Sequence, residues 1–386
     1  MKITDPQKQY MRKEASNMKK LQYTYSRRRL FSGYDGKFCK VAPHLAFDGE
    51  QTALLSYQML LLTGSDVFYG QYVARSTDGG KTFSEPVLQE ALKDRYENGV
   101  RYTASGFPCY NRHHKKWFGL GHRGSFADDK QPICRGGISI TDPLYFSLDG
   151  ETGCFTGYRP LPFPVPYISA VTGAQLIELE NGDILVPFYY TTEDFVRARC
   201  LTVRYAFDGD ELKIVGWGDP VDGGEGHARG LCEPSLARLN GKYYMTIRTD
   251  EVGLYAVSED GCHFSEPIPW AWEDGSVLEN YNTQQHWICH PEGLFLAYTR
   301  KGAHNDHVFR HRAPIFMARF DEERGCLIRE SEIILVPELG ARLGNFAVTE
   351  ASEKEAWLIT AEWMQPRGCE KYGSDNSLWH ACIEWK

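Results

Sequence analysis

Short apolar runs and short polar turns alternate along most of the chain. In six segments an apolar run, a polar turn and a second apolar run follow one another, and dipeptides such as Asn-Gly, Asp-Gly and Glu-Gly stand in the turns. These dipeptides favour β-hairpins because glycine and asparagine tolerate a positive φ. Apolar runs of this length between turn signals predict strands. The segments begin near Pro43, Pro108, Ala174, Pro234, His286 and Phe346.

The spacing of the six segments predicts an all-β protein, a six-bladed β-propeller. Segment starts lie roughly 50 to 65 residues apart, which is room for one four-stranded sheet and its loops. Each segment would then supply the first two strands of one blade. A seven-bladed ring is the alternative if one repeat is misplaced, and a jelly-roll sandwich fits the spacing less well.

The two ends of the chain are predicted to complete one blade together. After Trp363 one strand-like run remains, Leu378–Trp385, so the sixth sheet lacks a fourth strand. Leu21–Leu30 can supply that strand, which removes an exposed sheet edge. We therefore predict one propeller domain over residues 21–386. Residues 1–20 form an N-terminal helical extension in this prediction, with a short amphipathic helix over 5–20.

Composition excludes several classes of protein. The 386 residues are 42% apolar and 24% charged, as in an ordinary globular protein. A net charge of −8 argues against a nucleic-acid-binding or anionic-membrane surface. Eleven cysteines, an odd number without a CxxC pair, predict neither a disulfide framework nor a zinc site. We expect no cofactor and no metal. The sequence shows no signal segment, so we expect a cytoplasmic protein unless a signal was removed, and the oligomeric state stays open.

Two segments of the chain nearly repeat each other. Ser76–Pro86 and Ser258–Pro267 each follow a strand-like run and share a Ser-x-Asp-Gly start and a Ser-Glu-Pro end. Serine and aspartate side chains bond the backbone of such a turn. The first copy, STDGGKTF, resembles the Asp-box (BNR repeat) of the sialidase superfamily, and weaker copies stand at Ser147–Gly150 and Phe207–Gly209. The resemblance implies a sialidase-like propeller in which these turns join the third and fourth strands of a blade.

Propeller topology predicts which residues share a face. The first strand of a blade leaves one face and the second strand returns to it, so first-strand starts and second-strand ends lie together, opposite the Asp-box turns. Polar side chains from several blades would then surround the axis and form a pocket. The residues at these positions are His44, Glu233, His286 and Asn345 at the starts, and His122, Arg248 and Arg300 at the ends.

The segment Arg300–Arg312 is the most basic stretch of the chain. It holds four permanent cations and three histidines, while the protein as a whole is acidic. Arginine binds a carboxylate through two parallel hydrogen bonds. We infer a substrate with a carboxylate or sulfate, such as an acidic sugar. The alternatives for this segment are a solvated basic loop and a metal site at His304 and His307.

The resemblance to sialidases also implies roles for particular residues. Sialidases hold the sugar carboxylate with three arginines, and use a tyrosine nucleophile assisted by a glutamate and an aspartate as acid/base. Glu233 and Arg248 match the fourth-blade glutamate and arginine of that set. Arg300 is the best match for another arginine, with Arg312 as the alternate.

Three positions depart from the sialidase pattern. Lys40–His44 replaces the first-blade Arg-Ile-Pro motif, no aspartate stands in Ala53–Tyr57, and no tyrosine stands in Gly344–Phe346. Histidine titrates near neutral pH and can take over acid–base work. The predicted catalytic residues are therefore Glu233, His286, Tyr281, His122 and His44, and the predicted substrate-binding residues are Arg248, Arg300, Arg312, Arg101, His304, Gln285 and Asn345.

Three functions remain open from the sequence. The leading hypothesis is an exo-acting glycoside hydrolase that removes a terminal acidic or deoxy sugar from an oligosaccharide or glycoside. The second is a polysaccharide lyase that cleaves uronic-acid glycans by β-elimination, with Arg248 or Arg300 beside the carboxylate and His286 or Tyr281 as the base. The third is a glycan-binding propeller without activity.

Overall fold

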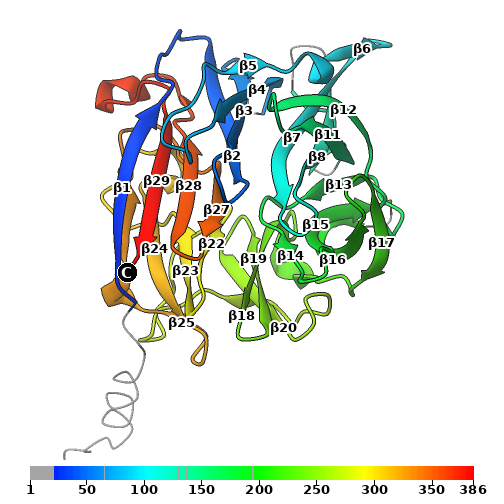
Figure 1. Ribbon diagram of the computed structural model, residues 1–386. Coiled ribbons are helices and arrows are strands. Elements are labelled where there is room, and N and C mark those ends of the chain that lie inside the picture. The colour runs from blue at the N-terminus through cyan, green and yellow to red at the C-terminus, as the bar shows by residue number, and fades with distance from the viewer. Residues whose placement is uncertain (1–20, 65, 128–130, 136–137, 194) are drawn as a thin grey trace, which may run out of the picture.

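Strands make up almost all of the regular structure of this protein. The computed structural model describes residues 21–64, 66–127, 131–135, 138–193 and 195–386, so the helix predicted over 5–20 lies outside the described residues. Six antiparallel sheets stand around a common axis (Figure 1). At five of the six junctions the first strands of neighbouring sheets contact one another, so these strands line the axis. The six-bladed prediction is confirmed, and the seven-bladed alternative is wrong.

The first three blades use the N-terminal half of the chain. Blade 1 contains β2 (Phe38–Phe47), β3 (Ala53–Leu61), β4 (Phe68–Ser76) and β5 (Val87–Leu88). Blade 2 contains β7 (Val100–Asn111), β8 (Lys116–Phe126), β11 (Thr141–Asp149) and β12 (Cys154–Pro160), with β6 (Arg95–Glu97) beside β7. A separate hairpin between β8 and β11 consists of β9 (Cys134–Arg135) and β10 (Ile138–Ser139). Blade 3 contains β13 (Ser169–Thr172), β14 (Ile177–Glu178), β15 (Ile184–Thr192), β16 (Phe195–Phe207) and β17 (Leu212–Trp217).

The C-terminal half forms the other three blades. Blade 4 contains β18 (Cys232–Leu239), β19 (Lys242–Arg248), β20 (Gly253–Ser258) and β21 (Ile268–Pro269). Blade 5 contains β22 (His286–His290), β23 (Gly293–Tyr298), β24 (Ile315–Asp321), β25 (Cys326–Leu327) and β26 (Ile333–Val336). Blade 6 contains β27 (Phe346–Ser352), β28 (Glu355–Ala361), β29 (Leu378–Trp385) and β1 (Tyr23–Leu30). The described 3-10 turns are η1 (Glu90–Leu92), η2 (Gly224–Gly226), η3 (Phe309–His311), η4 (Arg329–Ser331) and η5 (Cys369–Tyr372).

The N-terminal strand closes the ring. β1 pairs antiparallel with β29 along its whole length, from Tyr23 opposite Trp385 to Leu30 opposite Leu378 (Figure 1). This pairing joins the two ends of the described chain in one sheet and covers the edge of β29. The predicted closure of the last blade is confirmed.

The hydrophobic core is divided among the interfaces between blades. One buried cluster lies between each pair of neighbouring sheets, as expected for sheets packed face to face. Between blades 4 and 5 the rings of Trp270, Trp287 and Phe320 stand with centroids 5.5 Å apart. The aromatic content of the sequence therefore serves mainly to hold blades together.

Two inner strands contain bulges at proline. Pro43 and Pro234, taken from the sequence as segment starts, lie inside β2 and β18, where the strand register shifts. Proline cannot donate a ladder hydrogen bond, so a bulge accommodates it. The residue before each proline is left-handed, with φ of 46° at Ala42 and 47° at Glu233. Such a φ is strained for residues other than glycine and is common at functional sites.

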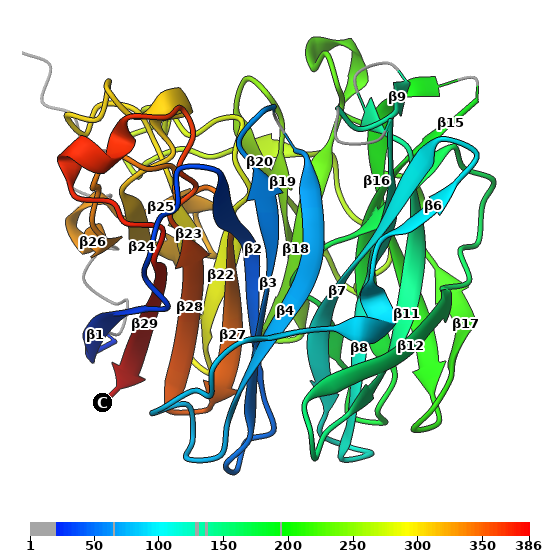
Figure 2. The same cartoon turned by 90° about the horizontal axis from the view of Figure 1, so that it is seen from above.

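The two faces of the ring differ in their loops. In five blades an aspartate accepts backbone N–H bonds in the turn between the third and fourth strands; these residues are Asp78, Asp149, Asp208, Asp260 and Asp321. Gly79 N–H bonds the Gln51 carbonyl, so this turn shares a face with the turn between β2 and β3. Figure 2 shows tight turns along one edge of the molecule and long loops along the other. In the part of the chain that the structure describes, no helix is long and apolar enough to span a membrane.

Candidate functional site

An ion pair between Glu233 and Arg248 lies on the long-loop face. Glu233 stands in the bulge of β18 and Arg248 ends β19, so the bulge turns the carboxylate toward the guanidinium. Arg248 Nη1 donates to Glu233 Oε1 over 2.7 Å. Burial opposes ionisation of Glu233, but the charges of Arg248, Arg312 and Arg229 outweigh it and hold the pKa of Glu233 below its usual value. The site therefore contains a carboxylate that stays ionised.

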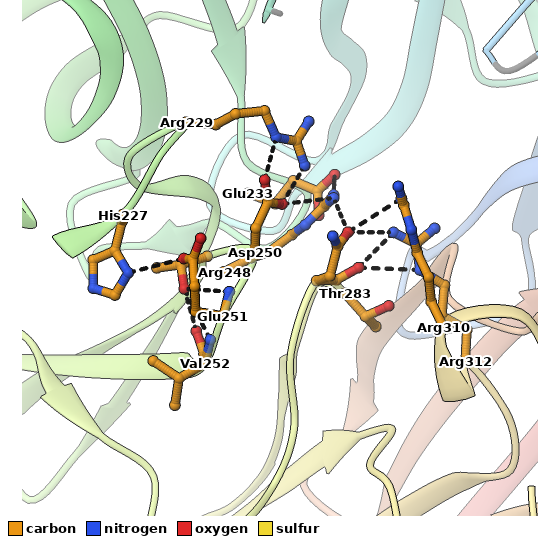
Figure 3. Close-up of polar contacts among 12 residues, drawn as sticks. His227, Arg229, Glu233, Arg248, Asp250, Glu251, Val252, Thr283, Arg310 and Arg312 are labelled. Atoms are coloured by element: carbon orange, nitrogen blue, oxygen red, sulfur yellow. Dashed lines mark hydrogen bonds and ion pairs between the residues drawn. The ribbon is translucent and has the colours of Figure 1, made fainter. Parts of the chain in front are cut away.

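Three arginines from two blades converge on one asparagine. The side-chain oxygen of Asn282, in the loop before β22, accepts bonds from Arg248 (2.8 Å), Arg312 (3.0 Å) and Arg310 (3.3 Å). Arg312 also donates to the Asn282 carbonyl over 3.0 Å. Figure 3 shows Arg310 and Arg312 reaching this point from one side and Arg248 from the other. We call Arg248, Arg310 and Arg312 with Asn282 the arginine cluster.

The arginine cluster has more positive charge than its acidic neighbours neutralise. Arg229 forms its own pair with Asp250, with 2.7 Å between Nε and Oδ2 (Figure 3). Among the described residues Arg310 and Arg312 have amide and carbonyl partners but no carboxylate within 4.0 Å. Burial, and then the charges of Arg248 and Arg342, lower the pKa of Arg312 well below its usual value. An anionic ligand would relieve this repulsion.

A fourth arginine approaches the cluster from blade 6. Arg342 is 3% exposed, lies over the Trp363 ring at 4.0 Å and donates to Gln365. Burial lowers its pKa to about 10, against the opposing charge of Asp66 in the loop between β3 and β4. Asp66 is therefore a carboxylate of blade 1 close to this side of the cluster. The aspartate expected in the second strand of blade 1 is absent from Ala53–Tyr57, and Asp66 stands in the loop that follows this strand.

A tyrosine and a histidine form a hydrogen-bonded pair next to the cluster. The hydroxyl of Tyr281 and Nδ1 of His311 lie 2.7 Å apart. Tyr281 precedes Asn282, and His311 stands between Arg310 and Arg312. Burial raises the pKa of Tyr281, and the charges of Arg310 and Arg312 oppose that rise. The pair thus places two groups that can exchange protons, a phenol and an imidazole, beside the arginine cluster.

Three predicted histidines meet near the axis, on strands of three blades. His286 Nδ1 lies 2.6 Å from the Ser235 hydroxyl, and His44 stacks on Phe107 with 4.6 Å between ring centroids. Burial lowers the pKa of His44 and His122 to about 4 and that of His286 to about 3. The charge of His44 lowers the pKa of His286 further, and that of His122 lowers the pKa of His44. We call these three the histidine group, and all of them are neutral at pH 7.

Comparisons with known proteins find similarity in structure only. No family model and no curated protein matches the sequence. A protein of unknown function from Dyadobacter fermentans superposes with a TM-score of 0.65 at 16% identity, over 93% of this chain and 99% of that one. Trypanosoma rangeli sialidase superposes with a TM-score of 0.60 at 16% identity, over 94% of this chain and 60% of that one. The intramolecular trans-sialidase of Ruminococcus gnavus reaches 0.57 at 13% identity, over 84% and 90%.

The chain has the sialidase-type propeller fold. Identity this low shows the fold and leaves activity to be argued from the site. The predicted resemblance is thereby confirmed at the level of architecture, and the chain spans about 60% of the trypanosomal sialidase's length.

Two predicted substrate-binding residues lie outside the arginine cluster of this sialidase-type propeller. Arg300 pairs with Glu332 through one edge of its guanidinium, with Nε and Nη2 donating to the two carboxylate oxygens at 2.7 Å and 2.6 Å. With His304 and Phe316 this pair lines a separate groove of about 290 Å³. Arg312, the alternate in the sequence analysis, takes the place in the cluster that was expected for Arg300. The sequence could not separate the two, because Glu332 lies 32 residues beyond Arg300.

The contacts of the three other predicted substrate-binding residues, Arg101, Gln285 and Asn345, are as follows. Arg101 is fully buried between blades 1 and 2, where it bonds Asp94 and Thr103 and lies 4.0 Å from the Tyr69 ring centroid. Gln285 accepts a bond from the Trp270 indole over 2.7 Å, away from the axis. Asn345 immediately precedes β27, and its side-chain oxygen is buried without a partner among the described residues.

Two positions clarify the departures from the sialidase pattern. Lys40 does not reach the arginine cluster, because its ammonium donates to the Asn376 carbonyl over 2.9 Å. Tyr189 in β15 is a tyrosine that was not among the residues predicted from the sequence. Burial, and then the charge of Glu233, raise its pKa well above its usual value. The phenol of Tyr189 is thus near Glu233 although the expected position before β27 holds none.

Two further features lie apart from the arginine cluster. A cavity of about 310 Å³ opens along the axis among β2, β7, β14 and β27, with His44 and Phe107 in its wall. Among the described residues, the three potential metal ligands that stand within 4.8 Å of one another are Glu355, Cys382 and Glu384, on β28 and β29. This group is on the second and third strands of blade 6, apart from the arginine cluster.

Proposed function

We propose that this protein is an exo-acting glycoside hydrolase that removes a terminal sugar carrying a carboxylate. The observation that carries the proposal is the convergence of Arg248, Arg310 and Arg312 on Asn282 without a carboxylate for two of them. Paired guanidinium N–H groups match a carboxylate in geometry as well as charge. Trypanosoma rangeli sialidase, whose fold this chain shares, has been solved with sialic acid bound.

In this proposal the cluster orients the sugar and Glu233 stabilises the transition state. A bound carboxylate takes the place of the Asn282 contacts or joins them, which fixes the ring beside Glu233. Glycoside cleavage develops positive charge at the anomeric carbon. The ionised carboxylate of Glu233 offers a fixed negative charge for that carbon, and its bond to Arg248 holds it in position.

A lyase is the second candidate function. Glu233 and Asp250, the carboxylates nearest the cluster, are both engaged by arginines, so neither is free to donate a proton. A lyase needs a cation beside a uronate carboxylate and a base for the adjacent C–H proton, and a cluster of arginines next to Tyr281 fits that requirement. The hydrolase and lyase hypotheses therefore share the arginine cluster as the binding site and differ in the products that they predict.

A product screen separates these functions. The protein is incubated with sialosides, uronate-capped and rhamnose-capped oligosaccharides, and the products are weighed by mass spectrometry. Hydrolysis adds water, about 18 Da, to the summed products, whereas elimination adds none and creates an unsaturated sugar that absorbs near 235 nm. Loss of turnover in Arg312→Gln but not in Arg300→Gln supports the assigned site. Binding without turnover of any glycan contradicts the enzymatic proposal and leaves a glycan-binding propeller.

A further inference from the structure

A chain of three side chains runs from the arginine cluster to the protein surface. The Tyr281 hydroxyl lies 2.7 Å from His311 Nδ1, and His311 Nε2 lies 3.3 Å from Asp306 Oδ1. With its proton on Nε2, the imidazole accepts a bond from the Tyr281 hydroxyl and donates one to the Asp306 carboxylate. The first contact is short and half-buried, and the second involves an exposed carboxylate.

The backbone holds His311 in this place at some cost. Arg310 and His311 are consecutive left-handed residues, with φ of 58° and 51°. A left-handed residue other than glycine costs about 1 to 2 kcal/mol, so two in a row need support from their surroundings. Asn305 supplies it, because this buried side chain donates to the carbonyls of Arg300 (2.9 Å) and Ala313 (2.7 Å) at the two ends of the loop.

We propose that Tyr281 and His311 form the proton-transfer pair of this site, with Asp306 as a positioning residue. The inference rests on the proposed function and names the groups that move the proton in it. Tyr281 touches the reacting water, and His311 receives the proton that Tyr281 passes on.

The step balances as a proton relay. A water molecule gives a proton to the Tyr281 oxygen while the Tyr281 hydroxyl proton moves to His311 Nδ1. The resulting hydroxide forms a bond to the anomeric carbon, and the glycosidic C–O bond breaks with its electron pair on the leaving oxygen. That oxygen takes a proton from bulk water, and the proton on His311 returns to solvent.

The surroundings favour His311 over the other histidines for this role. The histidine group is buried, and its pKa values of about 3 to 4 make its members weak bases. His307 in the same loop is bonded to Glu338 over 2.9 Å. An imidazole can accept a proton at one ring nitrogen while the other nitrogen donates a hydrogen bond. His311 combines that chemistry with a phenol partner and two flanking arginines.

The experiment compares Tyr281→Phe and His311→Gln with matched controls on a glycan found by the product screen. His263→Gln removes an exposed histidine paired with Asp260 over 2.7 Å at a turn on the opposite face, and Tyr25→Phe removes a hydroxyl on the outer strand β1. We measure kcat and KM separately from pH 5 to pH 9, and binding of the free acidic sugar by calorimetry.

We expect kcat to fall about 100-fold to 10,000-fold in both variants, the range for a lost general base, while sugar binding stays within about twofold. The pH profile of His311→Gln should differ from that of the wild type, because the imidazole that accepts the proton is absent. Asp306→Asn should lower the rate only about twofold to fivefold, because an exposed ion pair contributes little. The two control variants should retain the wild-type rate and profile.

Each other result has a clear meaning. Near-normal rates and an unchanged pH profile in Tyr281→Phe and His311→Gln overturn the proton-transfer pair, and the proposed function stands if Arg312→Gln is inactive. Unchanged turnover in Arg312→Gln as well, or cleavage of none of the glycans, overturns both. If Tyr281→Phe fails to fold, by circular dichroism, the pH profile of His311→Gln decides the question.

Discussion

Arg300 and Arg312 belong to the same blade, yet their surroundings differ in one decisive way. Arg300 has its charge matched by Glu332 through two hydrogen bonds. Arg312 is 5% exposed and bonds only neutral oxygen atoms of Asn282 among the described residues. The charge of Arg300 is thus neutralised within its own blade, whereas the charge of Arg312 is not. We therefore expect Arg312, and not Arg300, to bind an anionic ligand.

Removal of each arginine is the strongest test of this comparison. Arg312→Gln should weaken binding of N-acetylneuraminic acid or glucuronic acid about 100-fold to 1,000-fold, since a charge-assisted bidentate contact is lost. Arg300→Gln should leave that affinity within about twofold. Calorimetric titration of both variants measures the affinities. Equal losses in the two would show that the regions do not differ in function.

Asn282→Asp should give the arginine cluster a carboxylate partner of its own, as Glu332 is the partner of Arg300. The new carboxylate would lie within 2.8 to 3.3 Å of three guanidinium groups and compete with a bound anion. We expect about a 100-fold loss of anion affinity together with a higher urea midpoint of unfolding. The same titration and a urea denaturation series test this. Undiminished affinity would mean that the ligand binds elsewhere.

Acidic pH should lower the free energy of unfolding, because the histidine group near Glu233 is buried in its neutral form. The pKa of His286 is about 3 in the folded protein and near 6.5 in an unfolded chain, so the unfolded state binds a proton first as pH falls. The contribution of His286 to the free energy of unfolding is therefore fully present above about pH 6.5 and is lost as pH falls toward 3. At pH 4.5, His286 alone should lower the free energy of unfolding by about 2 to 3 kcal/mol relative to neutral pH. His286→Asn should flatten the dependence in urea unfolding at several pH values, and the exposed His263→Asn should not.

The smallest expected effect concerns the ion pair between Arg300 and Glu332. Glu332→Gln leaves Arg300 with a neutral partner, so we expect a loss of about 1 to 2 kcal/mol in the free energy of unfolding and unchanged sugar affinity. Urea denaturation measures the first quantity and calorimetry the second. A Glu332→Gln variant that gains affinity for acidic sugars at its own groove would show that Arg300 becomes a binding site once its partner is removed.

Much of the architecture was predictable because it repeats. Hairpin signals recurred along the chain, and Leu21–Leu30 was the strand left over to complete blade 6, as its pairing with β29 shows. Glu233 and Arg248 were found because a first-strand start and a second-strand end must share a face. Asn282, His311 and Asp66 were missed because they lie in irregular loops, where spacing carries no information about direction.

The sequence by itself determined the number of blades, the closure of the ring and the face that holds the charged residues, because hydrophobic period and turn chemistry act between near neighbours. Only the tertiary structure decided which arginines are neutralised: Glu332 meets Arg300, whereas Arg312 meets Arg248 from another blade. Coulomb interactions depend on separation in space, and loops that fold back across blades set that separation.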